Sequence, residues 1–236
     1  MILTKWLVRA LWLMAAIGAS GAASARSAFE ARCEALGPTV VVVTAGDAGY
    51  RVDNTKSWQQ LAQLKRPATP NTYVLGLTRA EARVAGMANG SMLQDPAGRS
   101  ECGAPRIEVT LRYEPMVVYI GSELAPGSCA YREVLAHEMR HLNTYLNHLR
   151  KVEATVRAAL VSRFAGKPLY GPAGQAGAQL QRELDGRWAE FIRRELEKVE
   201  PMQAAIDSPQ EYGRLSEVCG GEVQSLIRLS KRRTNS

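Results

Sequence analysis

The hydrophobic pattern of this 236-residue chain changes its period at Pro126-Gly127-Ser128. Before these residues, short runs of β-branched and aromatic residues are bounded by turn residues, which predicts strands. After them, apolar residues recur at helical spacing almost to the C-terminus. The chain is therefore expected to be an α+β protein, with a small mixed sheet and a short helix in its first half and long helices in its second half.

The clearest predicted strand is RIEVTLRY, residues 106–113, where apolar residues alternate with charged or polar ones. This alternation predicts one buried and one solvent-exposed face. A short helix is expected between Ser57 and Lys65, because Ser57 is a good N-cap ahead of apolar residues at helical spacing. The other predicted strands are residues 39–44, 49–54, 72–78 and 116–121.

Long helices are expected in the second half of the chain. The first spans residues 129–164 and the second residues 178–206, and a Gly- and Pro-rich loop between them would fold the two into an antiparallel hairpin. A further helix begins after Ser208, since Ser208 and Glu211 have the spacing of a capping box and Pro209 suits the first helical position.

Residues 1–25 have the layout of a cleaved secretory signal, with Lys5 and Arg9 flanking an apolar run that leads to the small triplet Ala23-Ser24-Ala25. An uncleaved membrane anchor is the alternative, but the apolar run is short for a bilayer span. We therefore expect a periplasmic or secreted protein with a single domain at residues 26–230 and a basic, disordered tail at residues 231–236.

The charge balance argues against a nucleic-acid partner. The predicted signal contains two basic residues and no acidic one, so its removal lowers the formal net charge from +7 to +5. The remaining basic residues are interleaved with acidic ones rather than gathered in a patch.

The cysteines Cys33, Cys102, Cys129 and Cys219 predict two disulfides, because an even number in an exported chain reads as a disulfide framework. Their spacing leaves all three pairings open. A pairing of Cys129 with Cys219 would tie the last helix to the start of the first long helix. A four-cysteine zinc site is not favoured, because no C-x-x-C spacing is present.

The first long helix contains the motif His137-Glu138-x-x-His141. Glu138 lies in the middle of an apolar stripe, where burial of a bare carboxylate costs several kcal/mol and a packing helix would carry Leu or Ala. The two histidines are one turn apart on the same flank, so both imidazoles can meet one ion. This pattern predicts a Zn2+ site with His137 and His141 as ligands and Glu138 as the general base of a hydrolase.

A third zinc ligand is not evident from spacing. His148 is one residue too late for the longer motif and lies about 10 Å along the helix axis from His141, so it is interpreted as a surface histidine. An antiparallel second helix would instead bring residues near 200–207 against the motif. The candidates are Glu200, Asp207 and Glu211.

The order of these features resembles a bacterial exported family of unknown function that is described as secreted zinc-dependent proteases. The resemblance covers most of the chain after the signal and rests on GYRVDN, VLGLT, CGAPRIEVTLRYEPMVVYI and the H-E-x-x-H helix. It implies a zincin-like fold, a zinc ion and peptidase activity. In that family a D-x-x-T-x-H-G pattern follows the second helix, and its His is the expected third ligand. Here residues 207–213 read DSPQEYG, with Tyr212 in place of the His, so Glu211 or Asp207 is the natural substitute, and Glu211 is ranked first.

These observations together predict an exported zinc metallopeptidase acting on a protein or peptide substrate. The segment MVVYIGSEL, residues 116–124, is the expected edge strand for an extended substrate because it leads directly into the zinc helix. Two alternatives stay open: a zinc-binding envelope protein without catalysis, and a disulfide-stabilised domain whose histidines are incidental.

Overall fold

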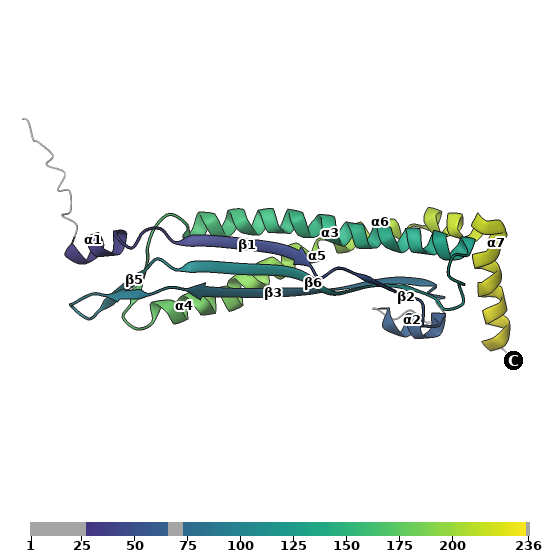
Figure 1. Ribbon diagram of the computed structural model, residues 1–236, viewed down its shortest axis with the longest axis horizontal. Coiled ribbons are helices and arrows are strands. Elements are labelled where there is room, and N and C mark those ends of the chain that lie inside the picture. Colours follow the sequence, from purple (N-terminus) through teal and green to yellow (C-terminus); the bar gives the residue numbers. More distant parts are fainter. Residues whose placement is uncertain (1–26, 66–72, 235–236) are drawn as a thin grey trace, which may run out of the picture.

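A computed structural model of the protein describes residues 27–65 and 73–234. The predicted secretory signal lies outside these residues. The molecule is elongated, and its longest helix runs beside the sheet along most of its length (Figure 1). Helices and strands are both abundant, as the sequence predicts.

The main sheet is organised around one long central strand, β6 (Arg106–Ile120). Strand β3 (Gly76–Asn89) pairs with it in antiparallel orientation along one side. Strands β1 (Val40–Asp47) and β2 (Arg51–Asp53) pair with it in parallel orientation on the other side, β1 beside its first half and β2 beside its second half. The sequence predicts residues 106–113 and 116–121 as separate strands. They form a single strand that ends at Ile120, so that only Gly121 lies outside it, and the peptide bond between Glu114 and Pro115 is cis.

Strand β3 is much longer than the predicted strand at residues 72–78. It starts at Gly76 and continues to Asn89 through a run rich in alanine and charged residues. Such residues have low β-propensity, and the strand forms because β6 supplies a partner along its whole length.

A second, small sheet contains β4 (Met92–Gln94), β5 (Ser100–Gly103) and β7 (Leu169–Pro172). Strand β7 lies in the segment that the sequence predicts to be only a loop. The buried carboxylate of Glu101 accepts backbone hydrogen bonds from Gly174 and Ala176, at 2.8 and 2.6 Å, and so holds the loop after β7. A disulfide between Cys33 and Cys102 ties helix α1 (Ala28–Glu34) to the same sheet.

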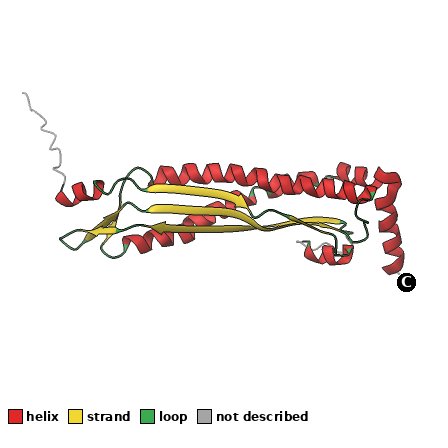
Figure 2. Ribbon diagram, in the orientation of Figure 1, coloured by secondary structure: helices red, strands yellow, loops and turns green. Residues whose placement is uncertain are grey.

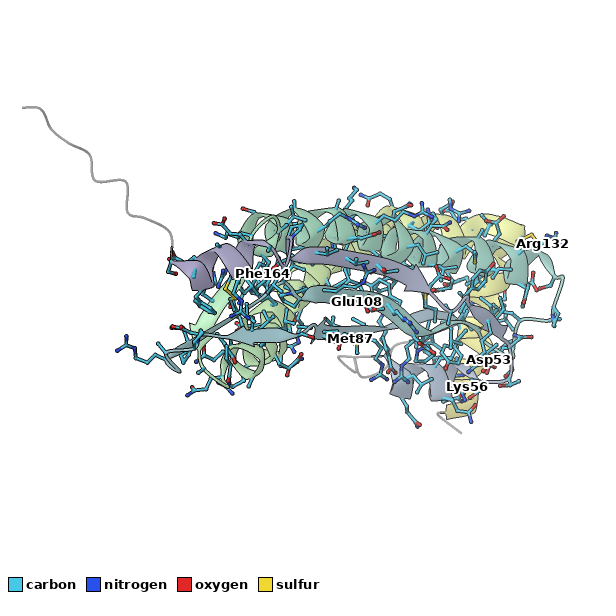
Figure 3. All side chains as sticks on the ribbon, turned by 60° about the vertical axis from the view of Figure 1, so that its left-hand side comes forward. Asp53, Lys56, Met87, Glu108, Arg132 and Phe164 are labelled. Atoms are coloured by element: carbon cyan, nitrogen blue, oxygen red, sulfur yellow. A yellow bond between two sulfur atoms is a disulfide. The ribbon has the colours of Figure 1, made fainter. Side chains whose placement is uncertain are left out.

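Helix α3 (Cys129–Phe164) has the predicted bounds, and the hydroxyl of its N-cap Ser128 accepts from the Tyr131 N–H at 3.1 Å. Figure 3 labels Arg132 near its first turn and Phe164 at its last residue, towards opposite ends of the molecule. The apolar stripe of α3 packs on one face of β1, β6 and β3. The buried apolar residues of α3 are Ala130, Val134, Leu142, Leu149, Val152, Val156, Leu160 and Phe164.

The opposite face of the sheet is covered only in part. Helix α2 (Trp58–Leu64), capped by Ser57 as predicted, packs Leu61 against Val117 and Tyr119 at the far end of β6. Over residues 106–113 of β6, buried residues alternate with more exposed ones, as predicted. The sheet face opposite α3 therefore carries charged residues such as Glu108 (Figure 3). Figure 2 shows α3 along one side of the strands and α2 on the other.

The second predicted helix is broken into pieces. Helix α4 (Ala176–Glu183) and the π-helical turn η1 (Leu184–Trp188) lie against β3. Helices α5 (Ala189–Glu197) and α6 (Glu200–Ile206) continue along α3. The contacts Arg163–Glu183, His148–Glu195 and His141–Gln203 set this segment beside α3 in antiparallel order, although it is not one uninterrupted helix.

Helix α7 (Pro209–Thr234) begins after Ser208, as predicted. It is interrupted at Val218–Gly221, where Cys219, Gly220 and Gly221 have φ angles of 57°, 65° and 77°, and its second part turns away from α3 (Figure 1). A disulfide joins Cys219 to Cys129, the first residue of α3. The helix continues through residues 231–234, which the sequence predicts to be a disordered tail. None of the helices in the described part of the chain has the length and apolar character needed to cross a membrane.

Candidate metal centre

The two motif histidines lie on α3 where α6 and α7 pack against it. Both side chains are buried, and their Nε2 atoms are 3.2 Å apart. The spacing of four residues places both rings on one side of the helix, as the motif predicts.

Asp207, which follows α6 directly, completes the group. Its Oδ1 lies 3.1 Å from Nε2 of His137 and 3.2 Å from Nε2 of His141. Two ligand atoms that are each 2.0–2.1 Å from a tetrahedral zinc ion lie about 3.3–3.4 Å apart, which is close to all three separations. His137, His141 and Asp207 could therefore hold a metal ion.

The charge state of Asp207 suits this arrangement. Burial alone would raise the pKa of its carboxyl, but hydrogen bonding to His137 and His141 outweighs burial and holds that pKa far below its usual range. Asp207 is therefore a carboxylate at neutral pH, which is the form that binds a cation.

Glu211, ranked first as third ligand from the sequence, lies on the other side of His137. Its Oε1 is 3.4 Å from Nδ1 of His137, whereas the ring nitrogen that faces Asp207 and His141 is Nε2. Hydrogen bonds from Arg214 and Arg140 lower the pKa of Glu211 to about 2. The structure thus brings Glu211 to the site but not into the ligand group. Glu200, the remaining candidate, is exposed and lies outside the group as well.

Glu138 is buried at the edge of the sheet, with only 4% of its surface exposed. The hydroxyl oxygen of Thr78 lies 2.8 Å from Oε2 of Glu138 and 3.0 Å from its main-chain oxygen. Burial raises the pKa of Glu138, which brings the carboxyl closer to the range in which it exchanges protons near neutral pH.

Gly76 provides the space that Glu138 occupies. A Cβ atom at Gly76 would lie 2.4 Å from Oε1 of Glu138 and 2.8 Å from Cγ1 of Val134. Neither Gly76 nor Thr78 was recognised as a site residue from the sequence. A glycine inside a predicted strand is nevertheless a sign of close approach by another group.

Gln203 and Tyr212 also reach the site. The amide oxygen of Gln203, a residue not considered in the sequence analysis, is 2.6 Å from Nδ1 of His141. Tyr212 stands where the resembling family has its His, and its ring centre is 6.2 Å from that of His137. Burial and the neighbouring Asp207, to which its hydroxyl hydrogen-bonds, raise the pKa of Tyr212.

His148 is not the surface residue that the sequence analysis predicts. Only 7% of it is exposed, and its Nε2 donates to the main-chain oxygen of Glu195 at 2.8 Å. Helix α5 packs beside α3 and buries this histidine. His148 is therefore a hydrogen-bonded core residue that lies outside the metal group.

The predicted substrate-binding edge is also corrected. Residues 116–120 belong to the central strand and pair with β3 on one side, while 117–119 pair with β2 on the other, so they present no free edge. The strand beside Glu138 is β3. The main-chain oxygen of Leu75 accepts from the N–H of Gly121 at 2.8 Å. In an antiparallel pair, the main-chain groups of successive residues point alternately towards and away from the partner strand. Those of Gly76, Thr78 and Ala80 therefore point away from β6. Among the described strands none pairs with this side of β3.

Comparison of the chain with protein-family models, with curated proteins and with solved structures finds no match in any of the three. The resemblance to exported zinc-dependent proteases therefore stays a prediction.

Proposed function

We propose that the protein is an exported zinc-dependent peptidase in which His137, His141 and Asp207 hold Zn2+ and Glu138 is the general base. The observation that carries the proposal is the meeting of two imidazole nitrogens and one carboxylate oxygen within 3.2 Å of one another, on the helix that also carries Glu138. Two nitrogen ligands and one oxygen ligand are a set that catalytic zinc commonly uses. The two disulfides agree with export, because such bonds persist in oxidising compartments.

Each residue has a separate role in this proposal. When bound, zinc polarises a carbonyl and lowers the pKa of a water molecule to about 7. Glu138 takes a proton from the attacking water and returns it to the leaving amine. Thr78 holds the carboxylate in one orientation while this happens.

The substrate in this proposal is an extended peptide. It would lie along β3 and pair with the outward main-chain groups of Gly76, Thr78 and Ala80, which places its backbone beside Glu138. This edge replaces residues 116–124 as the substrate-binding strand.

The test has a metal arm and an activity arm. Protein purified from an oxidising compartment is expected to contain one zinc per chain by atomic emission, and His137→Ala and Asp207→Ala are expected to lose it. Glu138→Gln is expected to keep the zinc and lose hydrolysis of a peptide library. Wild-type protein without bound zinc would overturn the proposal.

A second candidate is a zinc-binding protein without catalysis. The observation that favours it is the deep burial of Glu138, whose Oε2 is already engaged by Thr78. This candidate predicts stoichiometric zinc in the wild type and no hydrolysis of the peptide library by either wild type or Glu138→Gln.

A further inference from the structure

The second ring nitrogen of each motif histidine is contacted by a side chain from the returning part of the chain. For His141 the contact is Gln203, which is buried in α6 with 8% of its surface exposed. Its Oε1 lies 2.6 Å from Nδ1 of His141, and its Nε2 lies 3.2 Å from the main-chain oxygen of the same residue.

These two contacts determine the orientation of the Gln203 amide. A main-chain carbonyl oxygen only accepts hydrogen bonds, so the atom facing it is the NH2 group. The amide oxygen therefore faces Nδ1 of His141, and because that oxygen only accepts, Nδ1 carries a proton. A ring that binds a metal is neutral, so with the metal bound its lone pair is on Nε2, which is the atom that faces Asp207 Oδ1 and His137 Nε2.

The surroundings of His137 do not select one tautomer in this way. Its Nδ1 lies 3.4 Å from Oε1 of Glu211, which only accepts when ionised, and 3.0 Å from Nη2 of Arg140, which only donates. Arg140 and Arg214 both bind the Glu211 carboxylate. The contacts therefore fix which ring nitrogen carries the proton for His141 and not for His137.

We infer that Gln203 is a positioning residue that holds the imidazole of His141 in the Nδ1-protonated form, with Nε2 directed at the metal position. The inference rests on the proposed zinc site and names the group that orients one of its two histidines. Outer partners of this kind typically contribute 10- to 100-fold to metal affinity.

The experiment measures zinc affinity by competition with a chromophoric chelator. Gln203→Met keeps the length of the side chain but removes the acceptor, and we expect it to weaken zinc binding roughly 10- to 100-fold. Gln203→Glu keeps an acceptor oxygen and is expected to restore most of the affinity. The matched control is Gln210→Met at an exposed position of α7, which is expected to bind zinc as the wild type does.

The outcomes separate this inference from the proposed function. If the wild type binds no zinc, the proposed site itself is wrong. If the wild type binds zinc, His137→Ala loses it, and Gln203→Met binds as tightly as its control, only the positioning role is wrong.

A direct readout covers variants that do not fold. Long-range 1H–15N spectra of zinc-loaded wild type are expected to show His141 protonated at Nδ1 and metal-bound at Nε2. Metal-bound Nδ1 in the His141 ring would overturn the inference.

Discussion

Thr78 and Glu138 are 60 residues apart in the sequence, yet the Thr78 hydroxyl oxygen lies 2.8 Å from Oε2 of Glu138. The contact joins the edge strand β3 to the motif helix α3. It gives the buried carboxylate a hydrogen-bond partner and a defined orientation, and it is the first contact to test by mutation.

Thr78→Val removes the hydroxyl with little change of shape. The carboxylate of Glu138 then loses its partner in a buried position, so we expect the free energy of unfolding to fall by about 1–3 kcal/mol and hydrolysis to decline. Urea denaturation measures the first effect. Thr78→Ser should retain most of the stability, and Thr155→Val, on the exposed side of α3, is the control for a threonine lost elsewhere. Equal stability of Thr78→Val and wild type would contradict the role of this hydroxyl.

Gly76→Ala places a methyl group where the Glu138 side chain lies. The new Cβ would be 2.4 Å from Oε1 of Glu138, so we expect a loss of about 1–3 kcal/mol of stability from overpacking. Gly46→Ala is a matched control in β1, because nothing lies within 4 Å of the added atom. The two unfolding midpoints are compared in urea, and indistinguishable midpoints would show that Gly76 is not needed for the fit of Glu138.

Removal of the Cys129–Cys219 disulfide is expected to weaken zinc binding as well as stability. The bond fixes α7, which follows Asp207 and carries Glu211, to the start of α3. Replacing both cysteines by alanine should lower the unfolding free energy by about 2–5 kcal/mol and raise the dissociation constant for zinc. The Cys33–Cys102 pair, replaced in the same way, should lower stability by a comparable amount and leave zinc affinity unchanged, because it ties α1 to β5. A zinc affinity that falls equally in both double variants would contradict this distinction.

Zinc itself should stabilise the folded protein. Free zinc at one hundred times its dissociation constant adds about 2.7 kcal/mol, which corresponds to a rise of roughly 5–10 °C in melting temperature for a chain of this size. Differential scanning fluorimetry with and without chelator measures the shift. In Asp207→Ala the shift should vanish, and a shift of wild-type size in that variant would remove Asp207 from the ligand set.

Asp53, which pairs with Tyr119 at the end of β2, is expected to contribute pH-dependent stability. Hydrogen bonds from Thr55, together with Arg51, lower the pKa of Asp53 from its ordinary value of 3.8 to about 2. Because the folded-state pKa is the lower one, this stabilisation is present above the unfolded pKa and is lost as the pH falls through about 2. Asp53→Asn should therefore be less stable than wild type at pH 6, with the difference shrinking towards pH 2. A constant difference across that range, measured by urea unfolding, would exclude the linkage.

Much of the local structure was predictable because its cause lies within a few consecutive residues. Four features depend on side-chain period and capping, which a short window of sequence contains: the bounds of α3, the Ser57 cap, the buried alternation of residues 106–113, and the facing pair His137 and His141. The same holds for the start of α7 at Pro209.

The tertiary structure decided which distant groups meet that helix. Asp207 and Glu211 lie in one short segment, and the turn between α6 and α7 places Asp207 at the two Nε2 atoms and Glu211 at Nδ1 of His137. The burial of His148 by α5, the interior position of residues 116–120 and the contacts of Thr78 and Gln203 likewise arise from the packing of elements far apart in the chain. Period and spacing specify which face an element buries, but the partner of that face is set by the rotation and register of elements that only the folded chain brings together.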